Sequence, residues 1–304
     1  MVATIAAAVA AMIPCVLKTK KNTTTGNISK KNFTCDPNIC QFEGHSKSLC
    51  FLVEGNRDNY PRKITFLSMM NDSRVLFKEM TMEFDKVING RQSVRGYKKD
   101  PVPQALIREI IDVARRAPSS MNTQPWHVHV LTGEVLDEVR SRNMTEMAAG
   151  AEVKRDIHSH DPYEGVHRER QIAIAKKLFA AMGIAREDAE RRQDWVLRGF
   201  RQFDAPVSLV LTYDRSLDPG AVVHFDLGAL CYGIVLAAWD RGLGTVINGQ
   251  GIMRSDIVRE VANIPDDQVI MTCVAMGYPD DSFAANGVRA DRETIDDFVT
   301  FVGF

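Results

Sequence analysis

Residues 117–126 read APSSMNTQPW, a short polar stretch that lies between two segments of contrasting periodicity. Pro118 and Pro125 bracket it and favour a loop. The side chains of Ser119, Ser120 and Asn122 can hydrogen-bond to the carbonyl and amide groups of a heterocyclic ring, but the same residue types also occur in ordinary turns. The stretch therefore predicts a loop, with either a ligand-binding or a simple turning role.

The flanks of this loop predict a helix and a strand. Proline suits the first turn of a helix, so a helix should begin at Pro103 and end before Pro118. After the loop, WHVHVL at 126–131 alternates as a half-buried strand does, with His127 and His129 on one side. The apolar faces expected are Leu106, Ile110, Val113 and Ala117 for the helix, and Trp126, Val128 and Val130 for the strand.

Helical and strand-like segments alternate through the rest of the chain without repeats, which predicts one α/β or α+β domain from about residue 81 to residue 304. The charged, irregular stretch 150–168 has the outline of a mobile flap. Residues 224–240 are apolar nearly all round and should be enclosed by protein, in a core or a subunit interface. His224 and Asp226 argue against a membrane span there. Further helices are expected at 134–147, 169–182 and 186–200, and strands at 207–213 and 269–277.

Charge and cysteine content exclude several classes of function. Residues 81–304 carry 27 Lys and Arg against 33 Asp and Glu, so the body offers no general attraction to nucleic acid. No Cys-x-x-Cys occurs, and neither His127 with His129 nor His158 with His160 has a partner that completes a metal site. Cys231 and Cys273 lie in apolar runs and should be small buried residues.

The first 80 residues differ from the body and have no assigned role. Their apolar run at 2–17 has no basic residue before Lys18 and is shorter than a bilayer span. Four cysteines and Asn-x-Ser/Thr triplets at Asn22, Asn27 and Asn32 would suit a secreted stalk, and the scarcity of acidic residues would suit an organellar presequence. We expect a disordered or targeting leader and a cytoplasmic body, with organellar targeting left open.

Two arginine-containing segments could hold an anionic ligand, since no glycine-rich phosphate loop follows a strand. In residues 91–97, RQSVRGY, extended spacing sends Arg91, Ser93 and Arg95 to the same side. Guanidinium groups pair with phosphate and can also lie beside a ring that gains negative charge. Arg289 and Arg292 follow near the C-terminus, before the apolar tail FVTFVGF.

These segments together resemble the nitroreductase family, and residues 117–126 carry its most recognisable motif. The resemblance continues through GLGT at 242–245, NGQG at 248–251 and GYP at 277–279 to the late arginines. It covers residues 81–304 and none of the leader. The flap, with DPYEGVHRER at 161–170 and KKLFAAMGIAREDAERR at 176–192, is more similar to the bacterial branch that acts on nitroaromatics than to the iodotyrosine deiodinase branch.

The resemblance implies a three-layer α/β/α sandwich of the α+β class that binds FMN in a groove between the two subunits of a homodimer. In its terms Arg91 and Ser93 lie at the ribityl-phosphate, Gln92 also binds the cofactor, and Arg95 lies at the pyrimidine end of the flavin. The backbone of Asn248, Gly249 and Gln250 lies beside the reactive edge of the ring. The remaining contacts are Arg289 and Arg292 to the phosphate, and Pro118, Ser119, Ser120 and Asn122 from the partner subunit.

The activity that the resemblance implies is electron transfer from NADH or NADPH through FMN to nitroaromatic acceptors, by a ping-pong mechanism and with quinones as further substrates. FMN supplies this chemistry, so no catalytic side chain is expected. Three alternatives stay open: reductive dehalogenation, enoate reduction, and a flavin-binding regulatory protein without turnover. No nucleic-acid partner, metal or stable membrane insertion is expected.

Overall fold

The computed structural model describes residues 49–54, 63–69, 75–79, 83–158 and 161–304. Internal contacts divide the chain into residues 1–80 and 81–304, and each unit is considered by itself. The boundary near residue 80 and the targeting role of the leader stay predictions. The apolar run at 2–17, the cysteines at 15, 35 and 40, the three Asn-x-Ser/Thr triplets and His160 lie outside the described residues.

The first unit contains an antiparallel sheet with the strand order β1-β2-β3. Residue pairs such as Leu49 with Ser68 and Thr65 with Glu79 define its register. The sequence patterns did not predict these strands. They are β1 Leu49–Glu54, β2 Lys63–Met69 and β3 Val75–Glu79.

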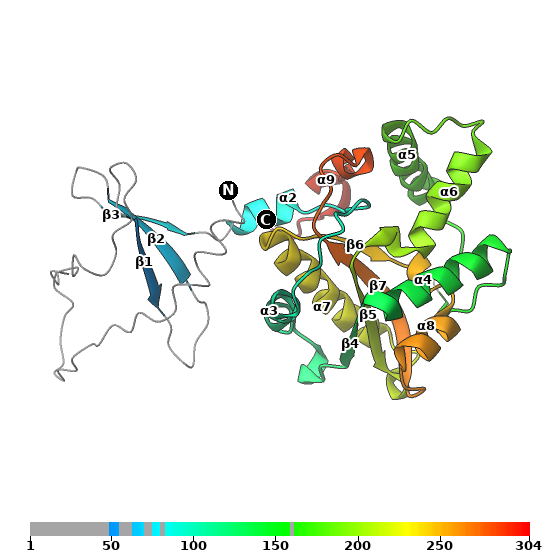
Figure 1. Cartoon of the computed structure of the whole chain (residues 1–304), viewed down its shortest axis with the longest axis horizontal. Coiled ribbons are helices and arrows are strands. Elements are labelled where there is room, and N and C mark those ends of the chain that lie inside the picture. Colours follow the sequence, from blue (N-terminus) through cyan, green and yellow to red (C-terminus); the bar gives the residue numbers. More distant parts are fainter. Residues whose placement is uncertain (1–48, 55–62, 70–74, 80–82, 159–160) are drawn as a thin grey trace. The chain divides into compact units, whose positions relative to one another are not determined.

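The second unit is built on an antiparallel sheet with the order β4-β5-β7-β6 (Figure 1). Every side chain of β5 from Val207 to Tyr213 is buried, as expected for a central strand. The strands are β4 Trp126–Thr132, β5 Val207–Asp214, β6 Gly244–Asn248 and β7 Gln268–Gly277. The helices are α2 Phe84–Gly90, α3 Gln104–Ala114, α4 Gly133–Ala148, α5 Gly165–Ala181, α6 Ala189–Phe200, α7 Ala221–Asp240, α8 Ser255–Ala262 and α9 Ile295–Phe298.

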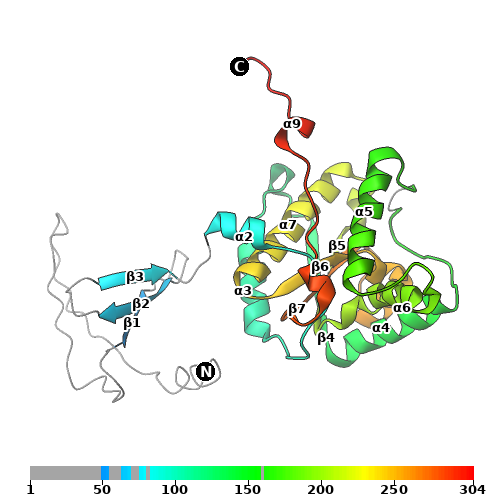
Figure 2. The ribbon, with the colours of Figure 1, turned by 90° about the horizontal axis from the view of Figure 1, so that it is seen from above.

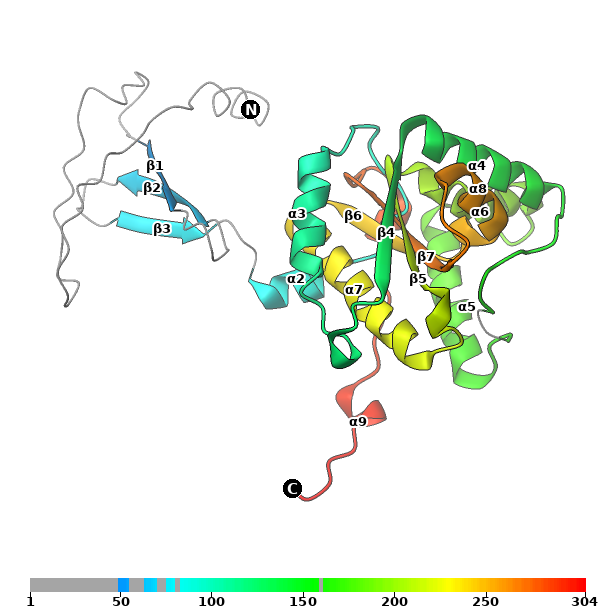
Figure 3. The same cartoon turned by 90° about the horizontal axis from the view of Figure 1, so that it is seen from below.

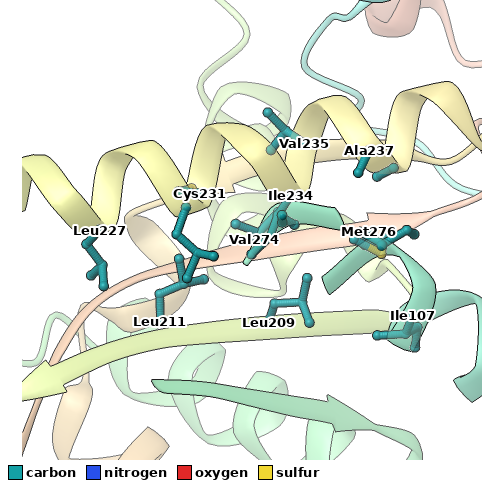
Figure 4. Packing of buried hydrophobic residues seen from close by; sticks show 14 of the residues in the cluster. Ile107, Leu209, Leu211, Leu227, Cys231, Ile234, Val235, Ala237, Val274 and Met276 are labelled. Carbon is teal, nitrogen blue, oxygen red and sulfur yellow. The ribbon is translucent and has the colours of Figure 1, made fainter. Parts of the chain in front are cut away.

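Helices cover both faces of this sheet, which confirms the predicted three-layer α/β/α arrangement (Figure 3). Helices α3 and α7 pack on one face, where Leu227 and Ile234 of α7 meet Leu209 of β5 and Val274 of β7 (Figure 4). On the other face α4 and α8 bury Leu136, Val139 and Val258 against β5 and β7. Burial of each large apolar side chain contributes roughly 1.5–3 kcal/mol, so these two cores determine the layers.

Helix α7 is the one described helix whose length and apolarity would suit a membrane span, and half of its most apolar stretch is buried in the protein. Its buried side faces the sheet. Its other side leaves Val222, Phe225 and Tyr232 exposed to 58%, 78% and 45%. The helix is therefore enclosed by one chain on one side only.

The apolar face predicted for the first helix was wrong in part. In α3 the fully buried side chains are Ile107, Ile110 and Ala114, whereas Val113 is 45% exposed. The predicted face was rotated because the sequence offers apolar residues on two adjacent stripes, and contact with α7 selects one of them.

The C-terminal residues after α9 run away from the layers of this unit (Figure 2). Phe298, Phe301, Val302 and Phe304 are between 66% and 106% exposed. The apolar tail thus has no covering surface within the described part of its own chain.

Candidate functional site

The segment after α2 lies along β6, at the edge of the main sheet. Ser93 forms a parallel bridge with Thr245, and the Val94 N–H donates to the Thr245 carbonyl at 2.9 Å. Val94 is fully buried beside Gly244, where an added Cβ would lie 2.5 Å from Val94 Cγ2. Because side chains alternate along extended backbone, the burial of Val94 leaves the opposite side for Arg91, Ser93 and Arg95, and their shared side stays a prediction.

A buried asparagine from far along the chain fixes the backbone at Arg95. Asn286 Oδ1 accepts the N–H groups of Arg95 at 2.7 Å and Gly96 at 3.2 Å. Its Nδ2 donates to the carbonyls of Gly96 at 2.8 Å and Asp280 at 2.9 Å. All polar groups of this amide are therefore used to hold one turn of the candidate site. No sequence pattern singled out Asn286, so its role was missed.

Arg95 is a half-buried cation that lacks an acidic partner. Burial lowers the pKa of its guanidinium, and Tyr97 nearby raises it by less. In the described structure its guanidinium donates from Nη1 to the Ser93 carbonyl at 3.4 Å. Among the described residues no carboxylate lies within ion-pair distance of Arg95. A desolvated cation without a counter-charge is unfavourable alone and favours an anionic ligand.

The turn after β6 is held by contacts on both of its peptide planes. The Asn248 carbonyl accepts a hydrogen bond from Cys273 Sγ at 3.0 Å, and Asn248 Oδ1 accepts the Gln250 N–H at 3.1 Å. Asn248 Nδ2 donates to the Gly199 carbonyl at 2.7 Å. Burial raises the pKa of the Cys273 thiol to about 12, so it remains a protonated donor. The turn predicted to meet the flavin edge is thus an ordered structure.

Arg155, which sequence reasoning did not select, completes this turn. Its Nη2 donates to the Gly249 carbonyl at 2.8 Å, while its Nε is buried without a hydrogen-bond partner. Burial lowers the pKa of this guanidinium. Arg155 belongs to the charged stretch 150–168, where the abundance of arginine gave no signal for one particular residue.

The late arginines are placed differently from one another. Arg289 Nη1 donates to the Gly90 carbonyl at 2.7 Å, beside the start of the Arg91 segment. Arg292 Nη1 instead donates to the carbonyls of Ala290 and Asp291, in its own exposed loop. In one chain, therefore, Arg289 joins the Arg91 segment and Arg292 does not. Close to the same segment, the Gln92 Oε1 atom is buried without a hydrogen bond.

The loop 118–122 lies apart from these groups within one chain. It precedes Trp126, which pairs with Tyr213, and Tyr213 pairs with Val269 at the start of β7. Thr245, which bridges to Ser93, pairs with Met276 near the end of β7. Seven residues of strand separate the two rows, about 23 Å. One chain therefore does not unite Pro118, Ser119, Ser120 and Asn122 with the Arg91 segment.

The loop is nevertheless well ordered by its own contacts. The buried carboxylate of Asp226 in α7 accepts the Ser120 N–H at 3.1 Å, and Ser119 Oγ accepts the Gln124 N–H at 3.0 Å. Met121 and Asn122 adopt positive φ values of 50° and 59°. Met121 is 94% exposed next to the exposed side of α7. This surface presents short polar groups outward rather than into its own chain.

No other group of residues competes as a reaction centre in the described ranges. No cluster of three His, Cys, Asp or Glu side chains that could hold a metal occurs there. His127 pairs with Asp214 at 2.9 Å, and His129 bonds to Gln268 at 2.8 Å, so both have structural partners. A cavity of about 220 Å³ between α4 and α8 is lined by ion-paired side chains such as Arg254 and Glu146. It is a polar surface recess separate from the candidate site.

Comparison with known proteins gives a consistent result. The model of the family described as "Nitroreductase family" matches residues 88–278. Chloronitrobenzene nitroreductase of Comamonas testosteroni is 34% identical over 220 residues, which is 72% of this chain and 96% of that protein. The 4-nitrobenzoate reductase of Pseudomonas putida is 32% identical over 225 residues, 74% of this chain and 98% of its own.

A solved structure extends the likeness to the fold. The FMN- and NADPH-dependent nitroreductase NfnB of Sphigopyxis sp. strain HMH superimposes with a TM-score of 0.70 at 28% identity, and the match covers 73% of this chain and 100% of that one. The residues matched by the family model, 88–278, lie in the second unit of the chain.

Proposed function

The chain belongs to the nitroreductase family, and on that premise we propose that it is an FMN-dependent oxidoreductase that transfers electrons from NADH or NADPH to nitroaromatic acceptors. The relatives named for reduction of chloronitrobenzene, nitrobenzene and 4-nitrobenzoate support this acceptor class. The related NfnB of Mycobacterium smegmatis has been solved in complex with NADPH, which supports a nicotinamide as the reductant.

The observation that carries the proposal is the uncompensated charge at Arg95. This half-buried guanidinium has no carboxylate partner in the described part of the chain, and it lies on the same side of the segment as Arg91 and Ser93. In the same segment Gln92 Oε1 is buried without a hydrogen bond, and the ordered turn at Gly249 follows β6, the strand to which Ser93 bridges. An anionic cofactor with a hydrogen-bonding ring fits this set of groups.

The residues act by binding and orientation. Arg91, Ser93 and Arg289 hold the phosphate and ribityl end of FMN, and Arg95 lies at the pyrimidine end, where positive charge favours the reduced ring. FMN supplies the redox chemistry when bound, accepting hydride from the nicotinamide and delivering two electrons to the acceptor. No nucleophilic side chain is required. We further propose a ping-pong order, in which the reductant leaves before the acceptor binds.

A homodimer is part of the proposal, because the site is incomplete in one chain. The exposed side of α7 with Val222 and Phe225, the neighbouring Met121 and the apolar tail after Phe298 support a second copy as the covering surface. The loop 118–122 of a partner subunit can then reach the Arg91 segment, whereas the loop of the same chain does not. In this arrangement Arg292 reaches a phosphate site only once the C-terminal tail is docked. That site belongs either to its own chain or to the partner.

The proposal is tested by reduction of the purified full-length protein. The FMN-loaded protein should be bleached by NADPH or NADH without oxygen, and its colour should return when nitrobenzene is added. Protein that binds FMN but is bleached by neither nicotinamide would favour a flavin-binding protein without turnover. Loss of halide from a halogenated phenol, without reduction of nitroaromatics, would favour a dehalogenase.

A further inference from the structure

The stretch 150–168 is anchored at three consecutive residues instead of being free along its length. The Lys154 N–H donates to the Met253 carbonyl at 2.8 Å, and the Lys154 carbonyl accepts the Ser255 N–H at 2.9 Å. The Asp156 carboxylate pairs with Arg259 and accepts the Ile270 N–H at 2.9 Å. Between these two anchors Arg155 points to the turn after β6. The expectation of a mobile flap therefore does not hold for residues 154–156.

The geometry of the turn shows what this contact controls. In a trans peptide the C=O and N–H groups point in opposite directions. The Asn248 carbonyl points to the buried Cys273 thiol, so the Gly249 N–H points away from the core. In the next peptide plane the Gln250 N–H is held by Asn248 and the Gly249 carbonyl by Arg155. Both planes of the turn are then fixed by side chains.

The turn needs this restraint because a glycine stands at position 249. Gly249 has φ −70° and ψ −21°, but a residue without a Cβ can also reach other backbone conformations at little cost. Rotation about Gly249 would turn its N–H away from its present direction. The guanidinium of Arg155 lies so close that a Cβ on Gly249 would be 3.2 Å from Nη2. Arg155 thus adds a side-chain restraint to the Gly249 carbonyl, beside the backbone bonding of the 3-10 helix Gln250–Ile252 that this glycine caps.

We propose that Arg155 is a positioning residue for the redox site. By donating a hydrogen bond to the Gly249 carbonyl, it keeps the Gly249 N–H directed at the reactive edge of the bound flavin. This inference rests on the proposed function, since it needs FMN at the turn. It assigns to the charged stretch 150–168 a part in electron transfer that is separate from substrate contact. Arg155 itself acts through the peptide and touches no reacting atom.

The test compares Arg155→Gln with Lys154→Gln in the full-length chain. Lys154 is the neighbouring cation, its side chain is 60% exposed, and its nearest carboxylate oxygen is 3.7 Å away on Asp256, so its loss leaves the turn intact. Hydrogen exchange of the peptide spanning residues 246–252 is measured by mass spectrometry without added flavin. Arg155→Gln should raise exchange there about tenfold, the effect of one charge-assisted hydrogen bond. Lys154→Gln should not change it.

A second readout links the turn to the reaction. With FMN saturating, Arg155→Gln should lower kcat for NADPH oxidation about tenfold with KM and FMN affinity within about twofold. Arg155→Lys, which retains one donor, should recover part of kcat. An altered KM with unchanged kcat, or unchanged exchange at 246–252, would overturn the proposal. If Arg155→Gln does not fold by circular dichroism, Gly249→Ala decides instead: it crowds the same contact, and unchanged exchange in that variant overturns the proposal equally.

The outcomes separate the two levels of inference. A wild-type protein that stays colourless with excess FMN would contradict the proposed function, and with it the role of Arg155 at a flavin. A wild-type protein that is yellow and reducible, together with an Arg155→Gln variant that behaves like it in both readouts, removes only the role of Arg155.

Discussion

Replacing Asn286 by alanine should disconnect the loop at 280–288 from the Arg95 segment. The amide makes hydrogen bonds of 2.7 Å and 3.2 Å to the N–H groups of Arg95 and Gly96, and of 2.8 Å and 2.9 Å to the carbonyls of Gly96 and Asp280. Asn286 is only 7% exposed, so water does not readily replace these partners. The N–H groups of Arg95 and Gly96 would lose their partner, whereas the carbonyls of Gly96 and Asp280 would each keep one other N–H donor, from Asp280 and Phe283, at 3.1 Å.

The expected cost follows from these contacts. At about 1 kcal/mol for each net hydrogen bond, Asn286→Ala should lower the free energy of unfolding by about 4 kcal/mol. This is below the roughly 5–15 kcal/mol that folded domains possess, so the variant should still fold. Because Arg95 loses its fixed backbone, the affinity for FMN should also fall, by about tenfold.

Equilibrium unfolding in urea, followed by tryptophan fluorescence without added flavin, measures the first effect. The midpoint should fall by about 1–2 M for a slope of roughly 3 kcal/mol per M. Ser282→Ala is the matched control, because Ser282 is exposed in the same loop and bonds only to Asp280; it should change the stability by less than about 0.5 kcal/mol. If the Asn286→Ala midpoint stays within about 0.3 M of wild type, the four bonds do not stabilise the segment as argued.

Three other perturbations test different parts of the account. Arg95→Met should raise the dissociation constant of FMN about tenfold to a hundredfold with an unchanged far-ultraviolet spectrum, because it removes the unpaired cation; the exposed Arg186→Met should not. Phe225→Asp should convert the dimer to monomer by analytical ultracentrifugation, because it places a charge at a side chain that is 78% exposed on α7. Cys231 and Cys273, whose thiol pKa values burial raises to about 12, should resist alkylation at pH 8 until the protein unfolds, as read by mass spectrometry of their peptides.

Each of these expectations has a contrary result. An Arg95→Met variant that binds FMN as tightly as Arg186→Met would contradict the electrostatic argument. A wild-type protein that is monomeric would contradict the proposed subunit interface. For the thiols, the direction in which the stability of the protein changes with pH is a further test. Their native pKa lies above the ordinary 9.0, so the stability that they contribute is complete below pH 9 and falls as pH rises toward 12. Stability that rises with pH across that interval would contradict the burial argument.

Local patterns in the sequence predicted most of the main sheet and its helices. The alternation in WHVHVL, the continuous apolar strands at β5 and β7 and the apolar α7 each depend on periodicity within a few residues. Strand β6 was missed because Gly244 and Asn248 at its ends are typical of turns. Its pairing with β7 is a long-range contact that no local pattern encodes.

The candidate site was predictable only where its residues are contiguous. The resemblance to nitroreductases supplied the Arg91 segment, the turn at Gly249 and Arg289, and the structure brings these together around β6. The family assignment is confirmed by the family model, whereas the role of each site residue stays a prediction. Asn286 was missed because its partners lie about 190 residues away in the chain.

Within one chain Arg292 and the loop 118–122 lie apart from the Arg91 segment, and no local pattern in the sequence encodes this. Periodicity cannot tell whether an exposed polar loop serves its own subunit or a partner, because both require the same residues. The structure adds a physical criterion, the separation of about 23 Å along the strands between the rows of Trp126 and Thr245. That separation is the reason why the account depends on a dimer.

The most direct measurement is the binding of FMN to the purified full-length protein. Titration should quench the flavin fluorescence with a stoichiometry of one FMN per chain, and the FMN-loaded protein should lose its visible absorption when NADPH is added without oxygen. A protein that leaves the fluorescence of FMN unchanged and remains colourless with excess cofactor would contradict the account.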